Sequence, residues 1–343
     1  MVSAPEHEAS RAPAVWTASL AAVSGSVMVG FMPLLARHLY AGGMGALSML
    51  VWRYALALVP LCLAIALMRL EFRTAWRRGA WQIVVIGATL GAAQTLCYWE
   101  SIKTLDTSIA VLLFYTYPAL TLALDRLVLK RPIRPRAVAS IAVILFGAGL
   151  ITVPGLRGGG ISLVGLAWAI PAPLIYSVYL VLTTSRLRRH PPVIGATCLY
   201  LGLVVVFGTS VMVTGFDWPA DGATWGILAF IAIGPGALTV TLFSYSVPKL
   251  GPSSYAIIAN SELVTTVTVG IVVLGEPITL ARAVGGAMIV AGILAHSLAR
   301  PKITTPSPPI GRRGRGARRE AREDKVVGLG ACPTHPTGGE GAV

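Results

Sequence analysis

Ten long apolar segments run along this chain, and they constrain its fold more than any other feature of the sequence. Crossing roughly 30 Å of hydrocarbon takes about 20 apolar residues in a helix, because no water is present to pair with an open backbone. Of all residues, 55% are hydrophobic and only 12% are charged, which also favours the bilayer as the solvent. The sequence therefore predicts an all-α integral membrane protein with ten transmembrane helices, at about 14–36, 44–68, 80–102, 107–128, 136–154, 161–184, 192–214, 223–247, 252–275 and 281–299.

Basic residues are distributed unevenly between the two sides that ten spans define. Of the 28 Lys and Arg residues, 23 fall on the side of the two termini, 4 fall on the opposite side, and Arg53 lies within the second span. Because short cytoplasmic segments are enriched in Lys and Arg, both termini are predicted to be cytoplasmic in a multi-pass protein of the plasma membrane, the inner membrane of a bacterium. The net charge of +14 is thus explained by the basic residues that set the orientation in the membrane. No nucleic acid is therefore predicted as a partner.

The two ends of the chain are predicted to lie outside the helical part. Residues 1–13 lack the basic start of a cleaved signal peptide, so they are predicted to remain as a cytoplasmic N-terminal segment. Residues 300–343 combine Pro, Gly and charge without a periodic apolar face, which predicts a disordered basic cytoplasmic tail. We expect this tail to lie near anionic lipid, and binding of RNA or of a partner protein is the alternative.

The sequence contains no pattern that is typical of a cofactor or metal site. The cysteines are Cys62, Cys97, Cys198 and Cys332, and they show neither a CxxC spacing nor a zinc-ligand pattern. No GxxxxGK[ST] pattern occurs either, which argues against a pump driven by nucleotide hydrolysis. We therefore expect no cofactor, no metal and no catalytic residues.

The sequence repeats itself at a constant offset of 145 residues. Segments 127–149 and 272–294 share seven identical pairs at this offset, including Gly147 with Gly292. Two five-helix repeats are thus predicted, and because five is an odd number the second must enter the membrane upside down relative to the first. Inverted repeats with a binding site between them are an architecture of secondary transporters. The predicted repeats are 14–154 and 155–299.

Four stretches of the sequence follow the helix pattern of one transporter family. The stretch from Ser254, SYAIIANSELVTTVTVGIVVLGEPITLARAVGGAMIVAGILA, has a helix that ends in LGE and a Gly-rich helix that returns. The other three are WRYALA, YWESIKTLDTSIAVLLFYTYPALTLAL and GLAWAIPAPLIYSVYLVLTTSR. Together they resemble two EamA-type domains of the drug/metabolite transporter superfamily over residues 14–299. The resemblance implies a ten-helix permease, although Arg131 stands where the family often has the counterpart of Glu276.

Charged side chains inside the spans require an explanation, because each costs at least about 2.5–3.5 kcal/mol at the centre of a membrane. Glu262 lies ten residues into the ninth span beside Asn260 and Ser261, and we predict that these residues form a substrate or coupling site. An interhelical hydrogen-bond anchor is the alternative for Glu262. Arg53, nine residues into the second span, is predicted either to hold a substrate or Glu262, or to pair with backbone carbonyls.

Aromatic and amide side chains in other spans are weaker candidates for the lining of a central cleft, because most aromatic residues in membranes serve packing. These candidates are Gln94, Tyr98, Tyr115, Tyr117, Tyr176 and Tyr179. Proline inside a span interrupts the backbone hydrogen bonds, so a second set of residues is predicted to mark hinges or helix breaks. These are Pro118, Pro171 and Pro173.

The sequence is best explained by a secondary active transporter that exports a small metabolite, such as an amino acid, by alternating access between the two repeats. Proton coupling through Glu262 is a hypothesis, because burial disfavours a charged carboxylate whereas a nearby arginine favours it. A multidrug efflux permease of the same fold is one alternative. An intramembrane enzyme is another, although no GxSG, GxGD or HExxH pattern supports it. A scaffolding membrane protein, the third, would not need buried charge.

Overall fold

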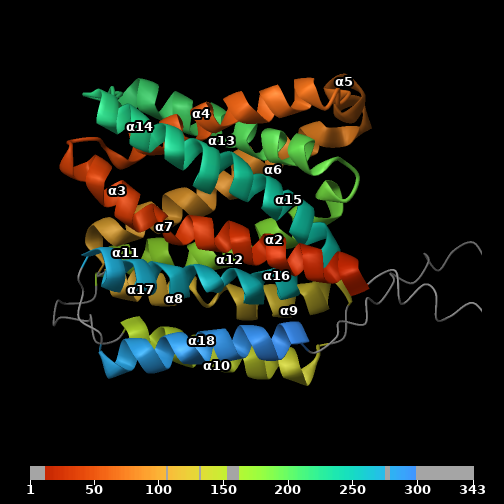
Figure 1. Cartoon of the computed structure of the whole chain (residues 1–343), viewed down its shortest axis with the longest axis vertical. Helices are drawn as coiled ribbons and strands as arrows, with labels where there is room; N and C mark the ends of the chain where they lie inside the picture. The colour runs from red at the N-terminus through yellow and green to blue at the C-terminus, as the bar shows by residue number, and fades with distance from the viewer. Residues whose placement is uncertain (1–11, 106, 131–132, 153–161, 275–278, 299–343) are drawn as a thin grey trace, which may run out of the picture. The chain divides into compact units, whose positions relative to one another are not determined.

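The computed structural model of the chain describes residues 12–105, 107–130, 133–152, 162–274 and 279–298 (Figure 1). Every regular element in these ranges is a helix. The described residues all belong to one compact unit. The predicted basic tail and nearly all of the predicted N-terminal segment lie outside the described residues, so both stay predictions.

The helices follow one another as ten spans, six of which are divided into shorter segments. The undivided spans are α4 (Ala46–Leu67), α10 (Pro135–Thr152), α13 (Pro192–Thr214) and α18 (Leu280–Leu298). The divided spans are α2–α3 (Ala12–Gly30, Met32–Ala41), α5–η1–α6–η2–α7 (Phe72–Ala75, Trp76–Ala80, Trp81–Ile86, Gly87–Gly91, Ala92–Thr104), α8–α9 (Thr107–Phe114, Tyr117–Leu129), α11–α12 (Leu163–Ala169, Pro171–Leu187), α14–η4–α15 (Gly222–Ile231, Ala232–Leu238, Thr239–Leu250) and α16–α17 (Pro252–Ala259, Ser261–Leu274).

Within the described part of the chain, nine spans are long and apolar enough to cross a membrane, and the fifth, Pro135–Ile151, is a shorter apolar helix. The predicted all-α fold class with ten transmembrane helices is thereby confirmed. The boundaries differ most in the third span, which begins at Phe72 rather than near residue 80. Its arginine-rich first turns are joined to the apolar part at Gly79, whose φ of 96° is a left-handed conformation that glycine adopts readily.

The offset of 145 residues that relates the two halves of the sequence also relates the irregular parts of the helices. The π-helical turns η2 and η4 begin at Gly87 and Ala232, which are 145 residues apart. The fourth span breaks after Phe114, at Tyr115, and the ninth breaks at Asn260, again at that offset. Equivalent helices of the two repeats are therefore interrupted at equivalent positions, which is where membrane helices often line a site.

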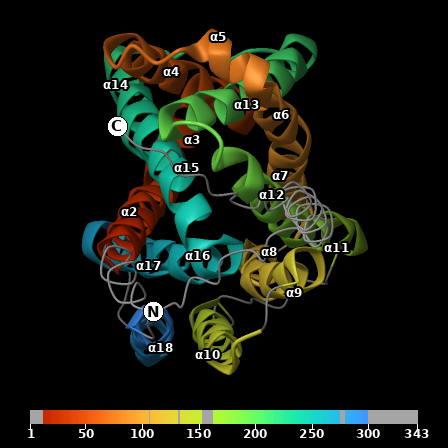
Figure 2. The ribbon, with the colours of Figure 1, turned by 90° about the vertical axis from the view of Figure 1, so that its right-hand side faces the viewer.

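The last helices of the two repeats, α10 and α18, lie side by side (Figures 1 and 2). Glycine allows this close approach: a Cβ at Gly147 would lie 2.7 Å from the carbonyl oxygen of Gly285, and one at Gly292 would lie 3.1 Å from that of Ser140. The two contacts are equivalent in the two repeats, because Gly292 stands 145 residues after Gly147 and Gly285 stands 145 residues after Ser140. A two-fold relation between inverted repeats produces this pattern.

Large buried side chains gather where α4 of the first repeat crosses α13 of the second. Met49 and Phe207 are fully buried. Tyr54 of α4 stacks on Phe207 at 5.8 Å between ring centroids and meets Tyr200 edge-on at 5.0 Å. This aromatic contact between the repeats lies next to Arg53, so the packed core and the candidate site adjoin each other.

Candidate functional site

The break in the ninth span sets the position of Glu262. The Asn260 side chain is fully buried, and its Nδ2 donates to the carbonyl oxygens of Ala256 at 2.7 Å and Ile257 at 3.3 Å. The amide thus replaces backbone donors at the end of α16. Glu262 lies in the first turn of α17, where free N–H groups and the helix dipole favour negative charge.

Two polar atoms beside Glu262 have no hydrogen-bond partner among the described residues. They are Asn260 Oδ1 and Ser261 Oγ, and both are buried. Buried polar atoms in proteins are nearly always paired, so a bound molecule or water is the expected partner here. Both residues belong to the set that the sequence analysis singled out.

An aromatic cluster surrounds Glu262. The Glu262 carboxylate interacts electrostatically with five tyrosines, which are Tyr98, Tyr115, Tyr117, Tyr176 and Tyr255. Phe114 connects their rings, with centroid distances of 5.1 Å to Tyr98 and 5.5 Å to Tyr176. The rings come from α7, α8–α9, α12 and α16, so the site draws on both repeats. Four of the five tyrosines were predicted from the sequence.

A further row of rings extends from this cluster towards Arg53. Tyr179 stacks on Tyr176 and on Phe243, at 5.9 Å between centroids in both cases. Phe243 in turn meets Tyr255 edge-on at 5.2 Å. Phe114, Phe243 and Tyr255 were not identified from the sequence. The sequence does contain one signal for Tyr255. It stands seven residues, or about two helical turns, before Glu262, and residues at that spacing lie on the same face of a helix.

Arg53 is held by the irregular turn in the eighth span. Its Nη2 donates to the carbonyl oxygen of Pro235 at 3.3 Å, and Pro235 lies inside the π-helical turn η4. The guanidinium also lies 5.4 Å from the centre of the Tyr54 ring and interacts with the Tyr200 hydroxyl. Tyr200 itself donates to the carbonyl oxygen of Gly236 at 3.3 Å. The wide π-helical turn presents both carbonyl oxygens to the side chains of α4 and α13, from which they accept these bonds.

The charges of Arg53 and Glu262 interact electrostatically with each other. The buried Nε of Arg53 donates to no described residue, so the guanidinium keeps a donor for a ligand. The rings of the aromatic cluster lie near Glu262, and the rings of Tyr54 and Tyr200 lie near Arg53. Such an arrangement is complementary to a small zwitterion with an apolar side chain, because a carboxylate pairs with Arg and an ammonium group pairs with Glu and with aromatic faces.

Gln94, one of the predicted cleft residues, forms a hydrogen bond with its neighbour in the sequence. It is half-buried on α7, and its Nε2 donates to the hydroxyl of the neighbouring Thr95 at 2.7 Å. This bond involves neither Arg53 nor Glu262. A role for Gln94 in the site stays a prediction.

The three predicted hinge prolines stand next to helix breaks. Pro118 lies in the first turn of α9, and Pro171 begins α12 after the break at Ile170. Pro173 is buried in the first turn of α12, where its carbonyl oxygen accepts a bond of 2.7 Å from Ser177 Oγ. The same hydroxyl contacts the carbonyl oxygen of Tyr117 at 3.1 Å, which joins α12 to α9 beside the aromatic cluster. Motion at these prolines stays a prediction.

Asp217 connects the two repeats at one end of the bundle, and the sequence analysis did not identify it. Its Oδ2 accepts bonds from Gly45 N at 2.9 Å and from Ser48 Oγ at 3.0 Å, both at the start of α4. Trp52 Nε1 donates to the Asp217 carbonyl oxygen at 3.1 Å and packs on Trp225 at 4.9 Å. A single acidic residue in a short connection gives no signal by itself, because only the fold brings it to α4.

No group of three or more His, Cys, Asp or Glu side chains that could hold a metal ion occurs within the described ranges. The site therefore consists of two opposite charges, several hydroxyl and amide groups, and aromatic rings. Groups of these kinds are suited to binding small polar molecules.

Comparisons with known proteins identify the family of the chain. A family model described as the EamA-like transporter family matches residues 16–153 and again residues 163–298. A protein of Streptantibioticus cattleyicolor named a probable terminal-alkyne amino-acid exporter is 28% identical over 272 residues, which are 78% of this chain and 84% of that protein. An uncharacterized transporter of Archaeoglobus fulgidus is 26% identical over 197 residues, which are 57% of this chain and 69% of that protein.

One solved crystal structure is similar in fold, with a TM-score of 0.70 and 19% sequence identity. The similarity covers 82% of this chain and 96% of the other. At that identity the likeness shows the fold alone.

Proposed function

We propose that this chain, a membrane transporter that belongs to the EamA-like transporter family, exports a small neutral amino acid across the plasma membrane in exchange for protons. The observation that carries the proposal is the pair of interacting charges, Arg53 and Glu262, next to an aromatic cluster that both repeats form. The printed name of the relative from Streptantibioticus cattleyicolor, an amino-acid exporter, supports the same substrate class.

Each group of the site has a role in this proposal. The free Nε of Arg53 binds the substrate carboxylate, and its charge is permanent. Glu262 binds the ammonium group, with Asn260 Oδ1 and Ser261 Oγ as further partners. The rings of Tyr98, Tyr115, Tyr117, Tyr176 and Tyr179 contact the side chain of the substrate.

Proton coupling follows from competition at one carboxylate. A glutamate at membrane depth binds either a proton or the ammonium group of the substrate, because both neutralise the same charge. If the site opens alternately to each side, substrate leaves when a proton arrives from outside, and the proton is released inside. Proton entry then drives substrate export.

Alternating access in this proposal uses the two inverted repeats, with both termini in the cytoplasm. The broken fourth, sixth and ninth spans support it, because a helix break allows two segments to change their angle without loss of internal backbone bonds. Pro118, Pro171 and Pro173 are the proposed hinges. The site lies between helices of both repeats, so a rocking motion of one against the other exposes it to each side in turn.

The proposal is tested with purified protein in vesicles that have an acidic interior. We expect wild-type protein to accumulate a labelled neutral amino acid as protons leave. Glu262→Gln should retain exchange of labelled for unlabelled substrate and lose accumulation driven by the pH gradient, because glutamine accepts a hydrogen bond but carries no proton. Glu262→Ala should lose both activities.

Arg53→Lys separates the amino-acid proposal from multidrug efflux. Loss of a charge-assisted hydrogen bond, worth about 1.5–3 kcal/mol, should weaken amino-acid binding roughly tenfold or more. A lipophilic cation needs Glu262 and the rings but not Arg53, so its transport should be unaffected. Glu71 is an exposed carboxylate outside the spans, so Glu71→Gln is the matched control.

Accumulation by Glu262→Gln equal to that of wild type would contradict proton coupling at this residue.

A further inference from the structure

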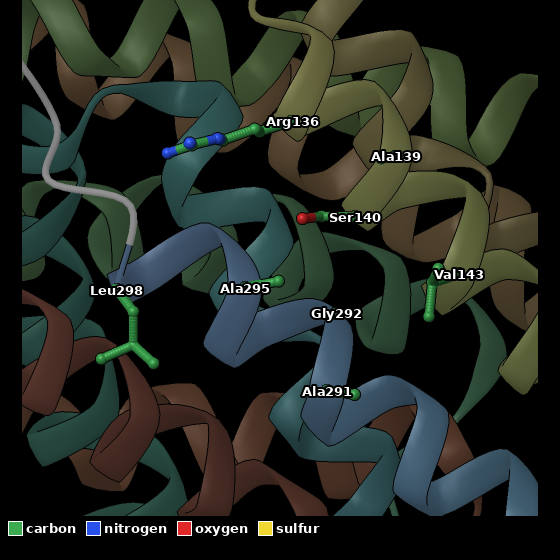
Figure 3. Close-up of a pocket in the computed structure, with 8 residues that line it drawn as sticks. All are labelled: Arg136, Ala139, Ser140, Val143, Ala291, Gly292, Ala295 and Leu298. Carbon is green, nitrogen blue, oxygen red and sulfur yellow. The ribbon is translucent and has the colours of Figure 1, made fainter.

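A groove with a volume of about 520 Å³ lies between α10 and α18, apart from the Glu262 site (Figure 3). Its walls are mostly small or aliphatic side chains, among them Ala139, Val143, Ala291 and Ala295. Arg136 extends from the first turn of α10 over the space between the two helices (Figure 3). The groove is therefore apolar along its length and carries a positive charge at one end.

Most residues that line the groove are exposed in the folded protein, and Ser140 and Gly292 are buried. Ala139 of α10 and Ala295 of α18 are exposed, and Leu298 at the same end of the groove is 63% exposed. In a ten-span membrane protein, an exposed apolar face between two helices meets lipid chains. An acyl chain gains little from the groove alone, because it already lies in hydrocarbon. Selection of one lipid must therefore come from the charged end.

The charged end favours a phosphate group. Arg136 is exposed and presents a planar guanidinium, which matches a phosphate through paired hydrogen bonds. The positive end of the α10 dipole lies in the same turn, since α10 begins at Pro135. This end is also the side that the distribution of Lys and Arg predicts to be cytoplasmic, where anionic lipid headgroups attract basic residues.

A second copy of the chain is a less suitable occupant of the groove. In a two-fold dimer with its axis along the membrane normal, the Arg136 side chains of both copies would come to the same depth at the same face. Their like charges would repel each other in an environment of low dielectric constant. An anionic lipid neutralises the charge instead.

We propose that the groove between α10 and α18 binds one anionic phospholipid, with its phosphate on Arg136 and one acyl chain along Ala139, Val143, Ala291 and Ala295. The site is separate from the proposed transport site, so it does not depend on the identity of the substrate. It adds a lipid of defined charge to the partners of this protein.

The test is native mass spectrometry of the purified full-length chain with equal amounts of phosphatidylglycerol and phosphatidylcholine. Wild-type protein should retain one phosphatidylglycerol in preference. Arg136→Gln should lower this retention about fivefold, which is the size of one basic residue's attraction to an anionic lipid surface. Arg136→Lys should restore much of it. Arg189→Gln removes an exposed arginine between α12 and α13, and it should leave retention unchanged.

A pair of alanines tests the groove independently of charge. Ala139 and Ala142 are both exposed on α10, but only Ala139 lines the groove. Ala139→Phe should displace the lipid, whereas Ala142→Phe should not, and both should keep the wild-type melting temperature. Added inorganic phosphate should not compete, because it lacks the acyl chain. Equal retention of both lipids by wild-type protein, equal loss in Arg189→Gln, or a change from dimer to monomer in Ala139→Phe would overturn the proposal.

Discussion

His190 shows how a single residue outside the membrane can couple stability to pH. It lies between α12 and α13, where partial burial and the charges of Arg189 and Arg78 lower the pKa of its imidazole below the usual 6.5. The folded protein then binds the proton more weakly than the unfolded chain does. Stability is therefore unaffected above the unfolded pKa and falls as the pH drops from about 6.5 towards the folded pKa.

We expect the melting temperature of the purified protein to decrease between about pH 7.5 and pH 5.5, and the decrease to be smaller in His190→Gln. Thermal unfolding in detergent, followed by intrinsic fluorescence at several pH values, measures the slope. His38→Gln removes an exposed histidine at the end of α3 and is the control. The same slope in His190→Gln and wild type would show that this imidazole is not responsible.

The charged residues of the site could be predicted from sequence, whereas several of its rings could not. Arg53 and Glu262 stand out because charge inside a long apolar segment is costly and rare. Phe114 and Phe243 give no such signal, because an aromatic residue in a span is as common in packing as in binding. Asn260 was noticed as a polar neighbour of Glu262, but its bonds to Ala256 and Ile257, which end α16, depend on the local backbone.

Among the helices, α13 of the second repeat passes close to the third span of the first repeat at Gly202. A Cβ at Gly202 would lie 2.3 Å from the Val84 carbonyl oxygen and 2.6 Å from Ala88 N. These neighbours are backbone atoms, which cannot move aside as a side chain can. Gly208 lies on the same helix with no atom within 4 Å of a Cβ at its position.

Gly202→Ala should therefore destabilise the protein by about 1–3 kcal/mol or more, because α13 and the third span must separate to admit the methyl group. Gly208→Ala should be neutral or stabilise by up to about 1 kcal/mol, because alanine favours a helix over glycine. Unfolding by a denaturing detergent measures both. If the two variants lost the same amount of stability, helix flexibility rather than close packing would be the cause.

The spans could be predicted at the level of elements, but most of their breaks could not. Apolar length determines where a helix crosses the membrane, so the ten predicted segments correspond to the ten observed spans. Pro118 and Pro171 indicated two of the breaks in advance. The π-helical turn at Ala232 contains Pro235, a signal that the sequence analysis did not use, whereas the turn at Gly87 contains no proline. Both turns make tertiary contacts, η2 with α13 and η4 with α4.

For the whole molecule, symmetry between the repeats was accessible from sequence through seven identical pairs. The structure extends it to features without sequence identity, such as the helix breaks at Tyr115 and Asn260. Backbone geometry and helix packing keep the two-fold relation where side chains have diverged. The site itself is asymmetric, because the offset pairs Glu262 with Tyr117 and Arg53 with Cys198.

The orientation of the whole molecule gives the last prediction. With both termini cytoplasmic, Cys332 in the tail faces the cytoplasm, and Ala220, exposed between α13 and α14, faces the opposite side. A charged, impermeant thiol reagent should then label Ala220→Cys in intact cells in a Cys332→Ser background. Cys332 of the wild-type chain should react only after permeabilisation. Cys62 is exposed within the α4 span, where a charged reagent does not enter, and Cys97 and Cys198 are buried, so Cys332→Ser alone is the unlabelled control. Labelling of Cys332 in intact cells would contradict the basic-residue asymmetry, and would place Arg136 and its groove on the outer side of the membrane.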